Sequence, residues 1–148
     1  MQRRDLYDSD AYKDILDRLG ELNAESQPQW GSMTVAQMLA HCAEVQDVTN
    51  GKELKGTPFI VKLMGGVIRK TVLAEKPYPK NLRTHKQYLM SDPEDFSRQM
   101  DRLLDSIKTM QVLGRRETKH PLFGKMSASD NGWAMYKHLD HHLTQFGV

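Results

Sequence analysis

Cysteine is almost absent from this chain of 148 residues, which carries Cys42 alone. A single cysteine cannot form an internal disulfide bond, so the sequence lacks the disulfide framework of small secreted domains. Long apolar runs are absent too, because residues 59–72, the longest such stretch, are interrupted by lysine, arginine and glycine and are too short to span a membrane. The N-terminal residues also lack the apolar segment of a signal peptide. These absences predict a cytoplasmic protein.

Neither sign of charge dominates the sequence. Lysine and arginine total 21 against 19 aspartate and glutamate residues, and basic pairs such as Arg3-Arg4 and Arg115-Arg116 are short and scattered. The sequence therefore predicts no strong attraction for nucleic acid or for an anionic membrane. Its hydrophobic share of 39% and charged share of 27% are ordinary for a globular protein. The length predicts one domain, residues 1–148.

Four segments carry apolar residues at spacings of three and four, the pattern of an amphipathic helix. We expect helices over residues 9–22, 34–49, 92–113 and 127–146. Asp92, followed by Pro93, is the expected N-cap of the third helix. Thr34 with Gln37, and Ser127 with Asp130, have the spacing of capping boxes at the second and last helices.

The link between the second and third helices, residues 52–91, is unusually long. It has room for a short extra helix over residues 59–73, although Gly65-Gly66 weakens that prediction, and Pro77 and Pro79 favour an extended stretch. The predicted fold class is all-α, a four-helix bundle with a long crossover between its second and third helices. Because long crossovers often cover a site, we expect this one to shape a pocket mouth together with residues 120–124.

Three of the six histidines fall within five residues near the C-terminus, at His138, His141 and His142. On a helical wheel, His142 lies roughly 60° and His138 roughly 100° from the centre of the apolar stripe, whereas His141 lies roughly 160° away. His138 and His142 are therefore one turn apart on one edge of the buried face. His141 is expected to point to solvent.

The second helix repeats this arrangement, because His41 lies roughly 95° from the centre of its own apolar stripe. If the two helices are neighbours, His41 meets His138 and His142 in the groove between them. Three histidines with coordination positions left for water or substrate are typical of a catalytic ion rather than a structural one. Glu44 and Gln145, each one turn after a histidine, are candidates for orienting the ligands or a substrate.

The same spacing has a second interpretation, in which the histidines are hydrogen-bonded groove residues of a non-catalytic bundle that binds a small molecule or a partner subunit. Other metal chemistries fit poorly. Leu139 stands where a zincin motif requires glutamate, and the only Glu-x-x-His spacing, ending at His120, falls in an expected loop. Cys42 lies within an apolar stripe, which indicates a core residue rather than a reactive thiol.

Residues 30–41 resemble the entry to the second helix of the DinB/YfiT-like superfamily, and residues 138–146 resemble its last-helix His-x-x-x-His segment. Residues 120–147 are most similar to a branch described only as a domain of unknown function. The resemblance implies a four-helix bundle, often a homodimer, in which His41, His138 and His142 bind a divalent metal, zinc or nickel. Relatives include thiol-dependent S-transferases and a mycothiol-dependent isomerase, in which the metal activates a low-molecular-weight thiol. We therefore expect a metal-dependent S-transferase, isomerase or hydrolase that acts on a small-molecule substrate.

Overall fold

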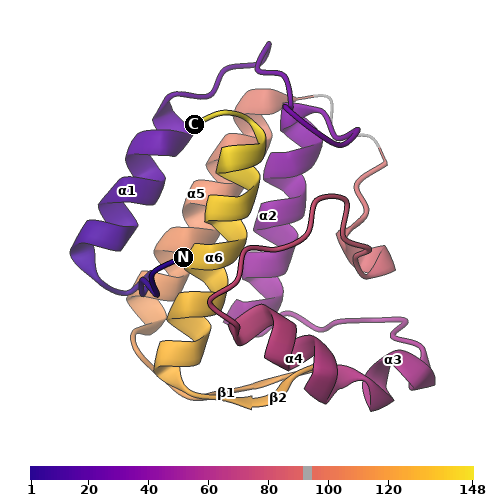
Figure 1. The fold of residues 1–148 in the computed structure, drawn as a ribbon. Helices are drawn as coiled ribbons and strands as arrows, with labels where there is room; N and C mark the ends of the chain where they lie inside the picture. The colour runs from indigo at the N-terminus through magenta and orange to yellow at the C-terminus, as the bar shows by residue number, and fades with distance from the viewer. Residues whose placement is uncertain (92–94) are drawn as a thin grey trace.

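A computed structural model describes residues 1–91 and 95–148 of the chain, which are mostly helical, as the all-α class predicts. Four longer helices lie side by side in Figure 1: α1 (Ser9–Gly20), α2 (Val35–Asn50), α5 (Phe96–Leu113) and α6 (Ala128–Gln145). Helix α2 packs along α5, and α6 contacts both α1 and α2. Within the described residues, none of these helices combines the length and apolar character needed to cross a membrane.

The ends of α2 and α6 follow the expected capping chemistry. The Thr34 hydroxyl accepts a hydrogen bond from the Gln37 amide N–H, and the Gln37 side chain accepts one from the Thr34 N–H, which completes a capping box. Ser127 likewise accepts from the Asp130 N–H at the start of α6. The Asp130 carboxylate, however, pairs with two arginines, so only the serine half of that predicted box is present.

Helix α5 begins at Phe96 with Asp95 as its N-cap, because the Asp95 carboxylate accepts a hydrogen bond from the Arg98 N–H. The N-cap expected from the sequence was Asp92, which lies with Pro93 outside the described residues. At the other end of α5, Gly114 provides the predicted C-cap with a φ of 70°, a left-handed value that glycine adopts without steric cost.

The link between α2 and α5 contains two helices and a turn rather than one short helix: α3 (Phe59–Leu63), α4 (Gly65–Leu73) and the 3-10 turn η1 (Lys86–Tyr88). The chain kinks at Met64, between α3 and α4. A Cβ atom on Gly65 would lie 2.2 Å from the carbonyl oxygen of Leu122, so no larger residue fits there. The glycine that weakened the helix prediction is therefore required by a close backbone approach.

The chain also forms a two-stranded antiparallel sheet that the sequence did not predict. Strands β1 (Thr118–His120) and β2 (Gly124–Met126) pair with Thr118 opposite Met126, and three residues per strand are too few to show an alternating pattern. The hairpin lies at the N-terminal end of α6 (Figure 1), roughly three turns before His138. Residues 120–124 therefore lie away from the histidines, whereas the sequence led us to expect them at the mouth of a pocket there.

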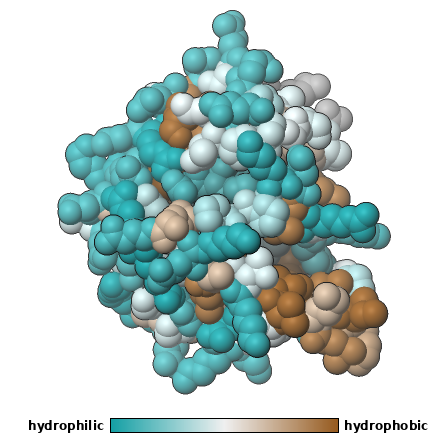
Figure 2. Space-filling model, in the orientation of Figure 1, coloured by the Kyte–Doolittle hydropathy of each residue, from teal (hydrophilic) through white to brown (hydrophobic). Residues whose placement is uncertain are grey.

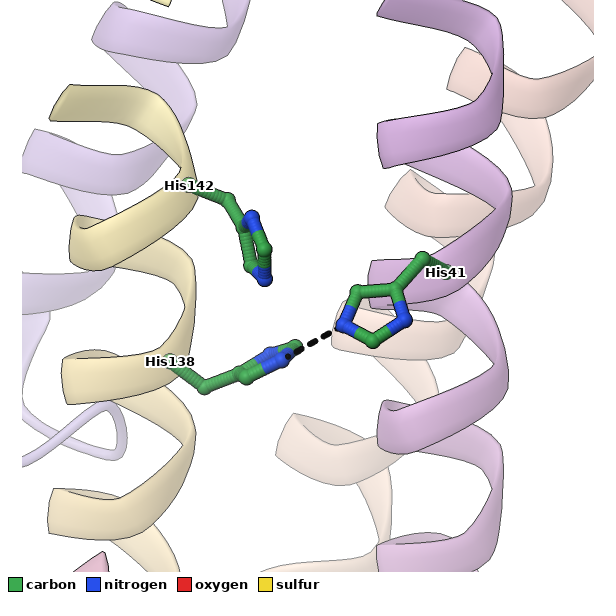
Figure 3. Close-up of side chains that lie close together, drawn as sticks. All are labelled: His41, His138 and His142. Atoms are coloured by element: carbon green, nitrogen blue, oxygen red, sulfur yellow. Dashed lines mark hydrogen bonds between the residues drawn. The ribbon is translucent and has the colours of Figure 1, made fainter. Parts of the chain in front are cut away.

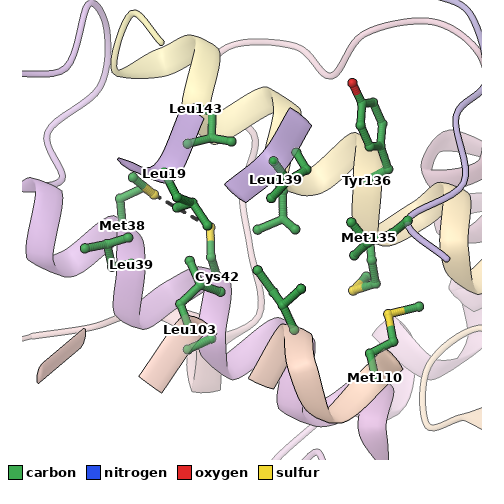
Figure 4. Packing of buried hydrophobic residues seen from close by; sticks show 14 of the residues in the cluster. Leu19, Met38, Leu39, Cys42, Leu103, Met110, Met135, Tyr136, Leu139 and Leu143 are labelled. Atoms are coloured by element: carbon green, nitrogen blue, oxygen red, sulfur yellow. Dashed lines mark hydrogen bonds between the residues drawn. The ribbon is translucent and has the colours of Figure 1, made fainter. Parts of the chain in front are cut away.

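The apolar core fills the space between the long helices (Figure 4). Leu39 of α2, Leu103 of α5 and Leu139 of α6 are all fully or almost fully buried there. Cys42 belongs to the same cluster, and its burial raises the pKa of the thiol. Its predicted place in the core is confirmed.

Candidate metal centre

Helices α2 and α6 bring three histidines together where the two helices face each other (Figure 3). One ring nitrogen from each of His41, His138 and His142 lies within 4.8 Å of the other two. The Nε2 atoms of His41 and His138 are 3.1 Å apart. His41 and His142 are buried, and His138 is partly exposed. The structure thus brings together three side chains that each lie at the edge of the apolar stripe of their own helix. This group can hold a metal ion.

The tautomer of His41 follows from its hydrogen bond to the crossover. Its Nδ1 atom lies 2.8 Å from the backbone carbonyl oxygen of Tyr88, the last residue of η1. A carbonyl oxygen can only accept a hydrogen bond, so the Nδ1 atom carries the proton and the Nε2 atom keeps an unprotonated lone pair. The crossover therefore reaches the histidine cluster, as its length led us to expect, and it fixes the chemical form of one ring.

The tautomer of His142 is fixed in the same way through Gln145. The Gln145 Nε2 atom donates to the carbonyl oxygen of Trp30 at 2.7 Å, which sets the orientation of the amide group. Its Oε1 atom then faces His142 Nδ1 at 2.9 Å and accepts the proton of that nitrogen. The Nε2 atom of His142 is thereby left with a free lone pair. Gln145, which the sequence indicated as an orienting residue, contacts the ring directly.

Two of the three rings therefore present lone pairs toward a common centre. Among the described residues, no hydrogen bond to a group of known role fixes the tautomer of His138. Without a bound cation, His138 relieves the repulsion by donating its Nε2 proton to His41 across the 3.1 Å contact. With its proton on the other ring nitrogen, His138 presents a third lone pair to the same point. The donor set fits a cation held by three imidazole nitrogens.

The electrostatic surroundings keep these rings neutral. Burial lowers the pKa of His41, and the bond to the Tyr88 carbonyl opposes that shift only in part. Burial, followed by the nearby His41, lowers the pKa of His142 to about 3. Burial, with His142 and His41 beside it, places the pKa of His138 well below its ordinary value. Neutral imidazole is the form that binds metals, so the site is ready for a cation at neutral pH.

A buried carboxylate holds the crossover segment in place through hydrogen bonds. Glu44, one turn after His41, accepts hydrogen bonds from Lys52 at 2.7 Å and from Gln87 at 2.9 Å, and it also pairs with Arg102. Gln87 immediately precedes Tyr88 in η1. Glu44 thus holds the segment whose carbonyl oxygen orients His41. The sequence predicted an orienting role for Glu44, and the structure shows that it acts through Gln87 and Tyr88 rather than by touching the ring.

His141 does not point to solvent, and that prediction was wrong. Its ring is partly buried, 5.8 Å from the ring of Trp30 and 5.6 Å from that of Tyr78. Lys137, on the same side of α6, is only 1% exposed, because it donates to three carbonyl oxygens at the end of α4. The crossover folds over the face of α6 that the helical wheel assigned to solvent.

Tyr78 and Tyr88 are neighbours of the histidines that the sequence did not predict. Tyr78 stands between two prolines, and an aromatic residue in such a stiff segment is a signal that could have been used. Tyr88 contributes a backbone carbonyl oxygen to His41. Every residue has such a group, so no sequence pattern could have found it.

The family model described as Protein of unknown function (DUF1569) matches residues 1–147. The chain belongs to this family. It matches none of the curated proteins and none of the solved structures with which it was compared. The DUF1569 match covers both helices that carry the histidines, and the family's description names no activity. Membership of the family therefore specifies no reaction.

Proposed function

We propose that this DUF1569 protein is a divalent-metal-dependent enzyme with a DinB-like four-helix bundle and a long crossover, and that His41, His138 and His142 hold its metal ion. One observation carries the proposal: the Tyr88 carbonyl and the Gln145 amide fix two Nε2 lone pairs toward the third histidine. Three protein nitrogens leave coordination positions for water or substrate, which is the arrangement of catalytic sites.

The donor set also narrows the choice of metal. Imidazole nitrogens suit zinc and nickel, whereas magnesium and calcium prefer oxygen ligands. The nearby carboxylate of Glu44 is engaged by Lys52, Gln87 and Arg102. Zinc–nitrogen bonds are about 2.0–2.1 Å long, so ligand atoms within 4.8 Å of one another need only small side-chain rotations to share an ion. Zinc or nickel is the proposed cofactor.

A bound ion of this kind lowers the pKa of a thiol or water molecule and so supplies a nucleophile at neutral pH. The chain's own contribution is positioning. Hydrogen bonds hold the rings of His41 and His142 in fixed orientations, and His138 is the least buried of the three side chains. The likeness of residues 30–41 and 138–146 to thiol-using relatives supports a cytoplasmic S-transferase or isomerase with a low-molecular-weight thiol, or a hydrolase.

The test begins with the full chain purified without a histidine tag, stripped of metal and reloaded with zinc or nickel. We expect the loaded protein to accelerate the reaction of a small thiol such as glutathione with a chlorodinitrobenzene electrophile, or the hydrolysis of an activated ester. The His138→Ala/His142→Ala variant should lose both metal and activity. The His141→Ala variant is the matched control, since His141 is a neighbour of the cluster and not a proposed ligand.

Metal content and activity separate the two interpretations of the site. A chain that binds one ion but accelerates neither reaction under any metal loading would contradict the enzymatic proposal. It would favour a binding module that uses its ion to hold a ligand. A chain that takes up neither zinc nor nickel would overturn the metal site itself.

A further inference from the structure

The surface of α3 and the start of α4 is apolar and uncovered. Five side chains form a continuous stripe at helical spacing, which we call the apolar ridge: Phe59, Ile60, Leu63, Met64 and Val67. Their exposed fractions lie between 50% and 76%. In Figure 2 the apolar colour gathers on the projecting corner of the molecule that Figure 1 assigns to α3 and α4. A contiguous exposed patch of this kind typically marks an interaction site.

The ridge is not explained by packing inside the chain. Helix α3 has no buried residue, although four of its five residues are apolar. A five-residue helix has little stability of its own, and its exposed apolar side chains gain nothing in water. A partner outside the chain that covers the ridge would stabilise the short helix and remove its apolar side chains from water.

Around the ridge, the charges left unpaired within the described residues are basic. Residues 54–74 contain four basic residues, Lys55, Lys62, Arg69 and Lys70, and no aspartate or glutamate. Lys55 lies 3.8 Å from the carboxylate of Glu53, and Arg69 pairs with Asp130 at 3.0 Å. Lys62 and Lys70 are exposed and have no ion-pair partner among the described residues. The chain's overall charge of +2 conceals this local excess, which the whole-chain balance could not reveal. The partner of the ridge is therefore expected to be anionic.

We propose that the apolar ridge docks on an anionic lipid surface, with its apolar side chains entering the interface and its lysines facing the headgroups. An exposed, projecting apolar helix flanked by lysine is the form of a peripheral membrane contact. A second copy of this chain would bring the same two lysines, Lys62 and Lys70, against one another. A partner helix would need a groove, whereas the ridge projects. This docking is separate from the metal site and does not rest on it.

The direct test is sedimentation of the full chain with two kinds of vesicle, phosphatidylcholine alone and phosphatidylcholine with about one-third phosphatidylglycerol. We expect binding to the anionic vesicles only, weakened by high salt. The Phe59→Ser/Leu63→Ser variant should bind at least about tenfold more weakly. The Lys62→Glu/Lys70→Glu variant should lose a similar factor or more, since each basic residue near such a surface contributes about fivefold.

Val112→Ser is the matched control, because Val112 is 79% exposed on α5, outside the ridge, and its loss should leave vesicle binding unchanged. Circular dichroism checks the helical content of every variant, and the charge variant keeps the test decisive if the apolar variant fails to fold. Equal binding to both vesicles, or binding to neither, would overturn the proposal. A dimer that the Phe59→Ser/Leu63→Ser variant separates, together with no vesicle binding, would assign the ridge to a second copy.

Discussion

Helices α6 and α3 depart from the ordinary distribution of side chains in opposite directions. Helix α6 buries Asn131, Lys137, His142 and Gln145, residue types that are mostly exposed or only partly buried in globular proteins. Helix α3 leaves its apolar side chains in water and buries none of its residues. In α6 these polar groups have hydrogen-bond partners, so their burial is compensated. In α3 the exposed apolar surface has no compensation within the chain.

The two helices differ in the kind of ligand that we propose for them. In α6, hydrogen bonds order polar side chains around the proposed ion site. In α3, exposed apolar side chains form the surface proposed to bind a lipid interface. Substitutions that change one helix without the other therefore test whether these two interpretations are independent.

Among substitutions of polar residues, Lys137→Met is expected to have the largest effect on stability. Its ammonium group donates to the carbonyl oxygens of Thr71, Val72 and Ala74, so the methionine leaves three acceptors at the end of α4 without their donor. We expect a loss of about 3 kcal/mol in the free energy of unfolding, measured by urea denaturation. Lys108→Met, at an exposed position of α5, should change it by less than about 0.5 kcal/mol. Equal effects of the two would show that the buried contacts of Lys137 do not stabilise the fold.

Removing the support of His142 should weaken metal binding more than folding. Gln145→Leu deletes both the acceptor for His142 Nδ1–H and the donor to the Trp30 carbonyl. We expect zinc affinity to fall by about 10- to 100-fold in a competition titration against a chelator. Gln145→Glu keeps the acceptor and should lose less. A Gln145→Leu variant that binds zinc as tightly as the unaltered chain would show that the amide does not prepare the ring.

Glu44 should contribute to the pH dependence of stability. Burial raises the pKa of Glu44, but hydrogen bonds from Lys52, Gln87 and Arg102 outweigh it and hold the pKa below its ordinary value of 4.5. The unfolded chain then binds the proton more readily, so this contribution is present above that ordinary value and is lost as the pH falls through the folded pKa.

Glu44→Gln is therefore expected to cost about 1 kcal/mol at neutral pH and to flatten the decline of stability in acid. Urea denaturation across a pH series measures both effects. Glu53→Gln, at an exposed position, is the control and should follow the unaltered chain. If the Glu44→Gln curve fell as steeply in acid as the original, another group would be responsible for the decline.

The smallest effect is expected in α3. The Phe59 side chain is 76% exposed, so Phe59→Ser should change the free energy of unfolding by less than about 0.5 kcal/mol. Leu139→Ala, at a buried position of α6, should cost about 2–5 kcal/mol in the same urea titration. A loss above about 1 kcal/mol for Phe59→Ser would mean that the ridge packs against the chain itself, and the contrast between the helices would disappear.

The sequence predicts those features that depend on local chemistry or on a single helix. Thr34 and Gln37 set the start of α2, and the shared edge position of His41, His138 and His142 anticipates their meeting. The sequence does not predict which side chains of α6 the crossover covers. The partial burial of His141 and the burial of Lys137 depend on how residues 71–78 fold back over α6, and such long-range packing leaves no periodic signal.

The most direct test of the metal centre is a zinc titration of the metal-free full chain, with His41→Ala, His142→Ala and His141→Ala measured beside it. We expect one tightly bound ion per chain, at least about 100-fold weaker binding in the first two variants, and nearly unchanged binding in the third. A chain that binds no zinc, or a His141→Ala variant that loses as much affinity as the other two, would contradict the three-histidine site.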